Sequence, residues 1–185
     1  QLAKLVVMKS EVFRDIVDME RSSLAKRSRK LFTLSAFHNA CADLVEGLST
    51  GDINGDATLA RDYWEAVAMH FPAWGQVREN RLPASEVREG YIHSHGIALQ
   101  ALGKAGNTLL RQHAKDWRKR LGALETIDWS RSNARTWEGR ALIGGKVSKV
   151  TTNVVLTTNV IKKAMSLPLD EEQQRVEAAN RRGSH

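Results

Sequence analysis

Basic side chains form three groups in this chain, and they are the residues whose type and spacing could do chemistry. The first group is the stretch RSSLAKRSRK, which places five cations in the ten positions from Arg21 to Lys30. Lysine and arginine bind DNA phosphates through charge and counterion release, and arginine can also contact guanine in the major groove. The residues of this stretch that we predict to bind DNA are Lys26, Arg27, Arg29 and Lys30.

The second group lies in NTLLRQHAKDWRKRL, residues 107–121, which we predict to be one amphipathic helix. Apolar residues such as Leu110 and Trp117 recur at helical spacing along one side, and the cations fall on the other side. A basic helix face of this kind can follow a DNA backbone. The cations that we predict to contact phosphates are Arg111, Lys115, Arg118 and Lys119.

The third group lies in residues 125–150, where periodicity is weak and we predict a long ordered loop. Trp129 and Trp137 in this loop could stack on bases. The backbone N–H groups of its glycine-containing turns could approach a phosphate. The cations that we predict to bind DNA here are Arg140, Lys146 and Lys149.

The overall charge agrees with an anionic partner. The chain has a formal net charge of +7, and residues 101–150 alone hold 11 basic and 4 acidic residues. Such asymmetry predicts one basic face and favours double-stranded DNA as the partner. The alternative for any single group is that its charges only form a solvated surface, and the sequence leaves that alternative open.

Other kinds of site find little support. His93 and His95 are two positions apart, which on a helix directs them to different faces, and no third ligand stands at metal spacing, so we expect no metal. The stretch LIGGKVSK lacks the spacing of a phosphate-binding P-loop, and we expect no cofactor. The single cysteine, Cys41, suits a reducing cytoplasm. The sequence contains no run of eighteen apolar residues, so we predict no membrane-spanning helix.

The elements that must position these residues are helices. Helical periodicity predicts a mainly α fold, an irregular multi-helix domain over residues 1–182, with the loop at 125–150. Thr33 or Ser35 can cap one helix. Residues 154–165 also resemble a strand, but their spacing favours a helix. The absence of an initial Met suggests a fragment, and residues 183–185 suggest a tag remnant. Further helices are predicted at 11–19, 57–71, 91–102, 107–121 and 170–181.

Four separated stretches carry a family resemblance. VFRDIVDMERSSLAKRSRKLFTLSA, VREGYIHSHGIALQALG, WEGRALIGGKVSK and NVVLTTNVIKKAMSLPLDEEQQRVE occur in this order. Together they resemble the C-terminal half of the DndB family, DNA sulfur modification proteins of the DGQHR-domain group. The resemblance implies a bacterial cytoplasmic protein associated with DNA phosphorothioation, which binds the promoter of the modification genes and represses them. The DGQHR signature itself is absent from this sequence, and the resemblance carries over no catalytic residue.

Three hypotheses follow. The first is a DNA-binding repressor of the phosphorothioation genes, to which this chain contributes a basic DNA-contacting or scaffold domain. The second is part of a DNA-acting enzyme or nucleotide hydrolase completed by an N-terminal half, for which the residues present give weak support. The third is a dimerisation module that uses apolar segments such as residues 154–165, and a homodimer is also compatible with the first hypothesis.

Overall fold

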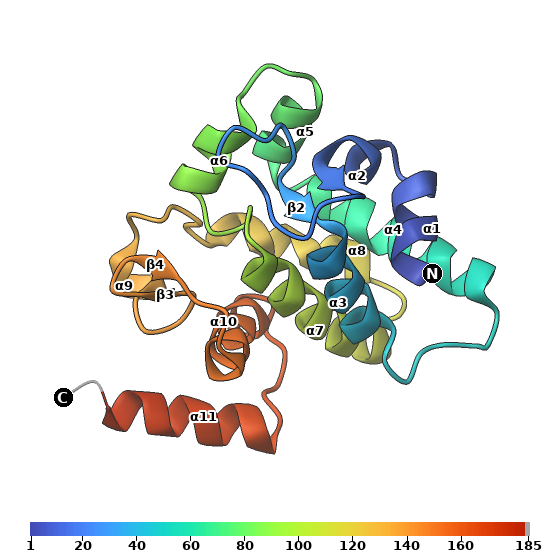
Figure 1. The fold of residues 1–185 in the computed structure, drawn as a ribbon. Coiled ribbons are helices and arrows are strands. Elements are labelled where there is room, and N and C mark those ends of the chain that lie inside the picture. Colours follow the sequence, from blue (N-terminus) through green and yellow to red (C-terminus); the bar gives the residue numbers. More distant parts are fainter. Residues whose placement is uncertain (184–185) are drawn as a thin grey trace.

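Two helices at the centre of the fold pack against each other more extensively than any other pair. The computed structural model describes residues 1–183, and they form the mainly α fold that the sequence predicts (Figure 1). The central pair is α3 (Leu34–Val45) and α7 (Gly96–Gln112). The predicted cap of α3 is confirmed, because the Thr33 hydroxyl accepts a hydrogen bond from the Ala36 N–H at 3.2 Å.

The predicted helix 91–102 is wrong at both ends, because α7 begins at Gly96 and continues through Gly103. A side-chain carbon at Gly103 would collide with the backbone carbonyl of Ala40 in α3. Glycine is therefore present at this position because the two central helices approach closely here, and it does not end the helix.

The N-terminal helices enclose an aromatic core. Phe13 stacks on Phe37 with ring centroids 4.7 Å apart, and Trp64 and Trp74 contact Phe13 by their edges. The helices here are α1 (Leu2–Lys9), α2 (Glu11–Ile16), α4 (Ile53–Ala68) and α5 (Pro72–Arg78).

Two predicted helices in this half have wrong boundaries. The helix predicted at 57–71 begins at Ile53, because the Asp52 carboxylate accepts the Asn54 N–H and caps it, and it ends at Ala68. The helix predicted at 11–19 ends at Ile16, because residues 17 and 18 leave it to pair with a second strand. These parallel strands are β1 (Val17–Asp18) and β2 (Phe32–Thr33), with Val17 opposite Phe32.

The single helix predicted at 107–121 is also wrong. The central helix ends at Gln112, a turn follows, and the chain continues as α8 and a 3-10 helix. The turn allows the Trp117 ring to pack beside Tyr63 in the core, with ring centroids 6.0 Å apart. Arg111 and Arg118 therefore do not share one helix face. The elements of this region are α6 (Ala84–Gly90), α8 (Trp117–Arg120) and η1 (Leu121–Thr126).

Residues 125–150 are ordered and contain small elements within the predicted loop. Trp129 and Trp137 stack on each other at 5.3 Å, and both are buried. Their indole N–H groups donate to the carbonyls of Leu124 and Asp128, at 3.0 and 2.8 Å. Both rings therefore belong to the core and are not available for stacking on bases. The elements are α9 (Ala134–Trp137) and the antiparallel strands β3 (Leu142–Ile143) and β4 (Lys146–Val147).

The last two helices, α10 (Thr151–Ala164) and α11 (Glu171–Arg182), agree with the predictions. The apolar side chains of α10 are buried, and α10 packs against α7, so residues 154–165 do not offer the dimerisation surface considered above. Figure 1 shows α11 at the edge of the molecule, next to α10. No helix within residues 1–183 combines the length and the apolar character needed to cross a bilayer. Ser184 and His185 lie outside the described residues.

Candidate nucleic-acid interface

The first basic group lies in a surface loop, residues 19–31, which we call the basic loop; it joins β1 to β2. One side chain, that of Arg88 in α6, holds this loop. Its guanidinium donates to the carbonyl of Lys26 at 2.9 Å and to the carbonyl of Lys30, with longer contacts of 3.3 Å to Ser28 and Ala25. Because the carbonyls turn inward to this one cation, the loop has a defined backbone.

The side chains of the basic loop face outward. The side chains of Lys26, Arg27 and Arg29 are exposed and make no hydrogen bond or ion pair with any other part of residues 1–183. Lys30 is half-buried, and its ammonium donates to the Asp15 carbonyl at 2.9 Å. Three of the four predicted contacts are therefore free for an anion, while Lys30 also anchors the loop.

The anchor of the basic loop continues into the third basic group. The carbonyl of Arg88 lies 2.6 Å from Nε2 of His95 and 3.4 Å from Nη1 of Arg131, and Nη2 of Arg131 donates to the Gly145 carbonyl at 3.1 Å. A carbonyl can only accept, so His95 carries its hydrogen on Nε2. Burial lowers the pKa of His95, and the nearby charges of Arg131 and Arg88 lower it further. One network thus joins the loop to the β3–β4 hairpin.

The hairpin presents two lysines and an occupied turn. Lys146 and Lys149 are exposed and unpaired within the described residues. Gly144 and Gly145 adopt φ of 59° and 76°, which glycine tolerates. Their N–H groups donate to the Glu138 carboxylate, at 3.1 Å for Gly145. This turn therefore binds an internal carboxylate, contrary to the expectation that its N–H groups would meet a phosphate.

A groove of about 430 Å³ lies between the start of the basic loop and the hairpin. It includes the N-terminal residues of α7, a helix whose start carries no side-chain cap. The N-terminus of a helix favours negative charge because its peptide dipoles align there. The polar residues that line the groove are Ser22, Thr33, Ser35, Asn39, His95, Gln100, Ser148 and Lys149. We call the basic loop, this groove and the hairpin the loop–hairpin face.

Arg140, the remaining predicted residue of the third group, points inward. Its guanidinium makes a two-pronged ion pair with Glu177 of α11, at 2.5 and 2.9 Å, and donates to the Leu156 carbonyl at 3.1 Å. The Arg140 side chain is 19% exposed and that of Glu177 is 6% exposed. Arg140 is therefore closed to outside anions while α11 is in place.

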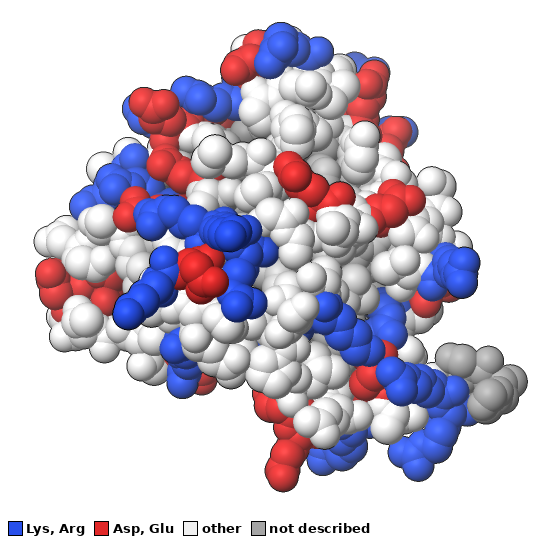
Figure 2. All heavy atoms as spheres, turned by 180° about the vertical axis from the view of Figure 1, so that it is seen from behind, with Lys and Arg blue, Asp and Glu red and all other residues white. Residues whose placement is uncertain are grey.

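The second basic group lies on the opposite side of the molecule. Figure 2 shows this side from behind, with a cluster of blue side chains around red ones over α8. Arg118 lies 3.7 Å from Asp62 and 4.3 Å above the Trp117 ring. Lys119 lines a groove together with Asp62 and Glu65. The expectation of one basic face is therefore wrong, because the basic groups lie on two faces.

The other predicted members of the second group differ from one another. Arg111 donates to the Glu46 carbonyl at 2.5 Å, whereas Lys115 is exposed and makes no contact of this kind within residues 1–183. Arg120, which belongs to the same group but is not among the predicted phosphate contacts, is paired with Asp116 at 3.0 Å. We call Lys115, Arg118, Lys119 and Arg120 the α8 face.

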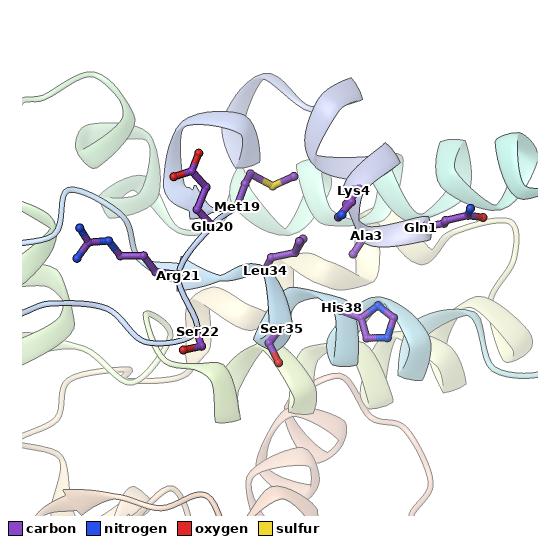
Figure 3. Close-up of a pocket in the computed structure, with 10 residues that line it drawn as sticks. All are labelled: Gln1, Ala3, Lys4, Met19, Glu20, Arg21, Ser22, Leu34, Ser35 and His38. Atoms are coloured by element: carbon purple, nitrogen blue, oxygen red, sulfur yellow. The ribbon is translucent and has the colours of Figure 1, made fainter.

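A further hollow of about 340 Å³ lies where the basic loop begins (Figure 3). Met19 and Leu34 contribute apolar surface to it, and Figure 3 shows Arg21 extending away from both of them. This mixture of apolar and isolated polar groups does not converge on a phosphate. Within residues 1–183, no three potential metal-ligating side chains come together.

Arg88 is the residue of this candidate site that sequence reasoning missed. Its carbonyl partners in the basic loop lie about sixty positions away in the sequence, at separations of 58 to 63 residues. It stands in a short helix among residues of both charges, where no local pattern distinguishes it from an exposed arginine. Only the folded chain shows that it organises the loop.

Comparison with known proteins gives one match. A family model described as DndB, DNA-sulfur modification-associated, matches residues 1–168. No curated protein and no solved structure matches the chain. The matched residues include the loop–hairpin face and the α8 face, and they end before α11.

Proposed function

This chain belongs to the DndB family of DNA-sulfur modification-associated proteins, and from that premise we propose that it is a DNA-binding repressor of the DNA phosphorothioation genes. In this proposal the loop–hairpin face contacts the duplex. The observation that carries the proposal is the set of unpaired cations on an anchored loop, Lys26, Arg27 and Arg29.

The loop–hairpin face suits a DNA backbone for two reasons. Its exposed cations Lys26, Arg27 and Arg29 form no ion pair within residues 1–183, so each can neutralise a phosphate without first breaking one. Its loop backbone is already organised by Arg88, so binding orders fewer residues and loses less conformational entropy. The groove beside it adds the N-terminus of α7 and Lys149.

The contacts differ in what they would contribute. Lysines bind phosphates as point charges and carry no sequence information, whereas an arginine can read guanine with two hydrogen bonds. We assign Lys26, Lys146 and Lys149 to backbone contacts, and Arg27 or Arg29 to base reading. A repressor commonly binds a symmetric operator as a dimer, so the proposal includes a homodimer on DNA.

The test is a fluorescence-anisotropy titration of the chain against its promoter duplex and a scrambled duplex, at about 50 and 200 mM salt. Arg27→Ala with Arg29→Ala should weaken promoter binding by roughly tenfold or more and reduce the preference for the promoter. The matched control is Arg118→Ala with Lys119→Ala, which removes the same charge from the α8 face and should change affinity less than about twofold. Equal losses in both double variants would contradict the assignment of the loop–hairpin face.

A further inference from the structure

The contact between α10 and α11 differs in kind from the other helix contacts. The side chains that α11 buries are polar, namely Gln173 and Glu177. The other long helices bury apolar side chains, which hydrophobic burial stabilises. The attachment of α11 therefore depends on hydrogen bonds and ion pairs, which another anion can replace.

Glu177 occupies a socket of converging donors. One carboxylate oxygen receives Nη2 of Arg140 at 2.5 Å and Nζ of Lys163 at 3.1 Å. The other receives Nη1 of Arg140 and Nδ2 of Asn159, both at 2.9 Å. These hydrogen bonds, with that of Arg140 the strongest, hold the pKa of Glu177 at about 2. Four donors around one carboxylate form an oxyanion site.

One donor of the socket, Arg140, is also held by a group outside α11, whereas Asn159 donates additionally to the Gln173 carbonyl of α11 at 3.2 Å. Arg140 also donates to the Leu156 carbonyl in α10, and Asn159 is fully buried in the same helix. The side-chain carbonyl of Asn159 has no partner among the described residues. Lys162, which is 3% exposed, lies beside the socket and donates to Gln173 at 2.8 Å. Without an anion, these neighbouring cations would be left uncompensated, which is costly in a partly buried position.

The donors of the socket and the Glu177 carboxylate that fills it also differ in whether the family model matches them. All of the donors lie within residues 1–168, which match the DndB model, and Glu177 lies beyond them. Arg140 shares its short segment with Lys146 and Lys149 of the hairpin. The socket donor Arg140 and these two lysines therefore belong to one short segment of the chain.

We propose that Arg140, Asn159 and Lys163 form a second phosphate-binding site, which the Glu177 carboxylate fills in the free protein and a DNA backbone phosphate fills in the complex. The planar fork of an arginine fits a carboxylate and a phosphate in the same bidentate way, so one occupant can replace the other. Displacement of α11 would add contacts to the loop–hairpin face. This inference rests on the proposed function for its source of phosphate.

The first experiment compares two single substitutions in the whole chain. Glu177→Gln removes the charge that fills the socket while keeping the shape of the side chain. Glu172→Gln removes the same charge from an exposed position on α11 whose side chain makes no hydrogen bond or ion pair within residues 1–183. In anisotropy titrations with duplex DNA, Glu177→Gln should raise affinity roughly three- to tenfold over Glu172→Gln, because the competing occupant is weakened. Equal affinities of the two variants would overturn the proposal.

The second experiment uses inorganic phosphate and needs no DNA. Phosphate should raise the Tm of Glu177→Gln well above the Tm in chloride at the same ionic strength, because an anion that binds the folded state stabilises it. The unmodified chain and Glu172→Gln should show a smaller rise. If Glu177→Gln gains no more than they do, the socket does not bind phosphate and the proposal fails.

The two experiments separate the possible failures. A chain that binds no DNA, but whose Glu177→Gln variant is stabilised by phosphate, would refute the proposed function and keep the socket as a phosphate site. DNA binding without any difference between the two variants would keep the proposed function and refute the socket. Hydrogen exchange gives an independent check, since DNA should reduce the protection of residues 171–182. Unchanged protection would refute the displacement of α11.

Discussion

The loop–hairpin face and the α8 face carry the same kinds of side chain, and they differ in the partners that the fold gives them. On the α8 face, Arg118 lies near Asp62 and Arg120 is paired with Asp116. On the loop–hairpin face, Arg27 and Arg29 have no carboxylate partner within the described residues, and the loop carrying them is held through its carbonyls. A count of basic residues thus says less about DNA binding than the placement of the acidic ones.

The difference has a simple electrostatic meaning. A cation that is already paired must lose or share its carboxylate before it can bind a phosphate, which reduces the free energy gained on DNA binding. An exposed ion pair of this kind also contributes little to stability. A cation held without a partner repels its neighbours and gains the full benefit of a phosphate. An anchor made of hydrogen bonds to carbonyls allows this second arrangement, because it fixes the backbone and leaves the side-chain charges free.

The largest effect should follow removal of the anchor. Arg88→Ala leaves the carbonyls of the basic loop without their donor and should destabilise the chain by about 2–3 kcal/mol, measured by chemical denaturation. DNA affinity should fall as far as in the Arg27→Ala, Arg29→Ala double variant, although Arg88 contacts no phosphate in the proposal. Arg88→Lys should not restore binding, since an ammonium cannot reach the same set of carbonyls. Unchanged DNA affinity of Arg88→Lys would show that only the charge at position 88 is needed for binding.

The next effect should be a loss of stability on acidification. It concerns the loop–hairpin face, because His95 contacts the carbonyl of the anchoring Arg88 and His93 lies two positions before His95. Burial lowers the pKa of His93 from 6.5 to about 3. Between these two pKa values, His93 is protonated in the unfolded chain and neutral in the folded chain. The free energy of unfolding therefore decreases as the pH falls from 6.5 toward 3. The expected slope is at most about 1.4 kcal/mol per pH unit for this group.

His93→Phe tests this slope. The imidazole stacks between Phe71 and Tyr91, with ring centroids 4.7 and 4.8 Å away, and a phenyl ring can occupy the same place. The variant should keep its stability at pH 7. Between pH 4 and pH 6, its free energy of unfolding should fall less steeply with decreasing pH, by the contribution of about one proton. An unchanged slope in denaturation curves would mean that other groups cause the acid sensitivity.

The smallest effect should separate two single lysines, one on each face. Lys149 and Lys115 are both exposed and unpaired within residues 1–183. Lys149→Ala should weaken DNA binding about two- to threefold and reduce the slope of log affinity against log salt by roughly 0.9, as expected for one phosphate contact. Lys115→Ala should change neither quantity. Equal slopes for the two variants would remove the distinction between the faces at the level of single charges.

The sequence by itself determined the helical character and several boundaries. Apolar residues at helical spacing predicted α10. The acidic residues at the start of 170–181 and the arginines at its end predicted α11, because the helix dipole and the periodicity act within a few residues. The cap at Thr33 was predictable for the same local reason. The motifs also predicted the DndB family, which the match over residues 1–168 confirms.

Only the tertiary structure decided which charges are free and which helices continue. Arg140 meets Glu177 across 37 positions, and Arg88 meets the basic loop across about sixty, so neither contact has a local signal. Gly103 continues a helix because another helix packs on it, and a turn interrupts residues 107–121 where Trp117 enters the core. Pairing and packing between distant segments depend on their arrangement in space, which local propensity does not contain.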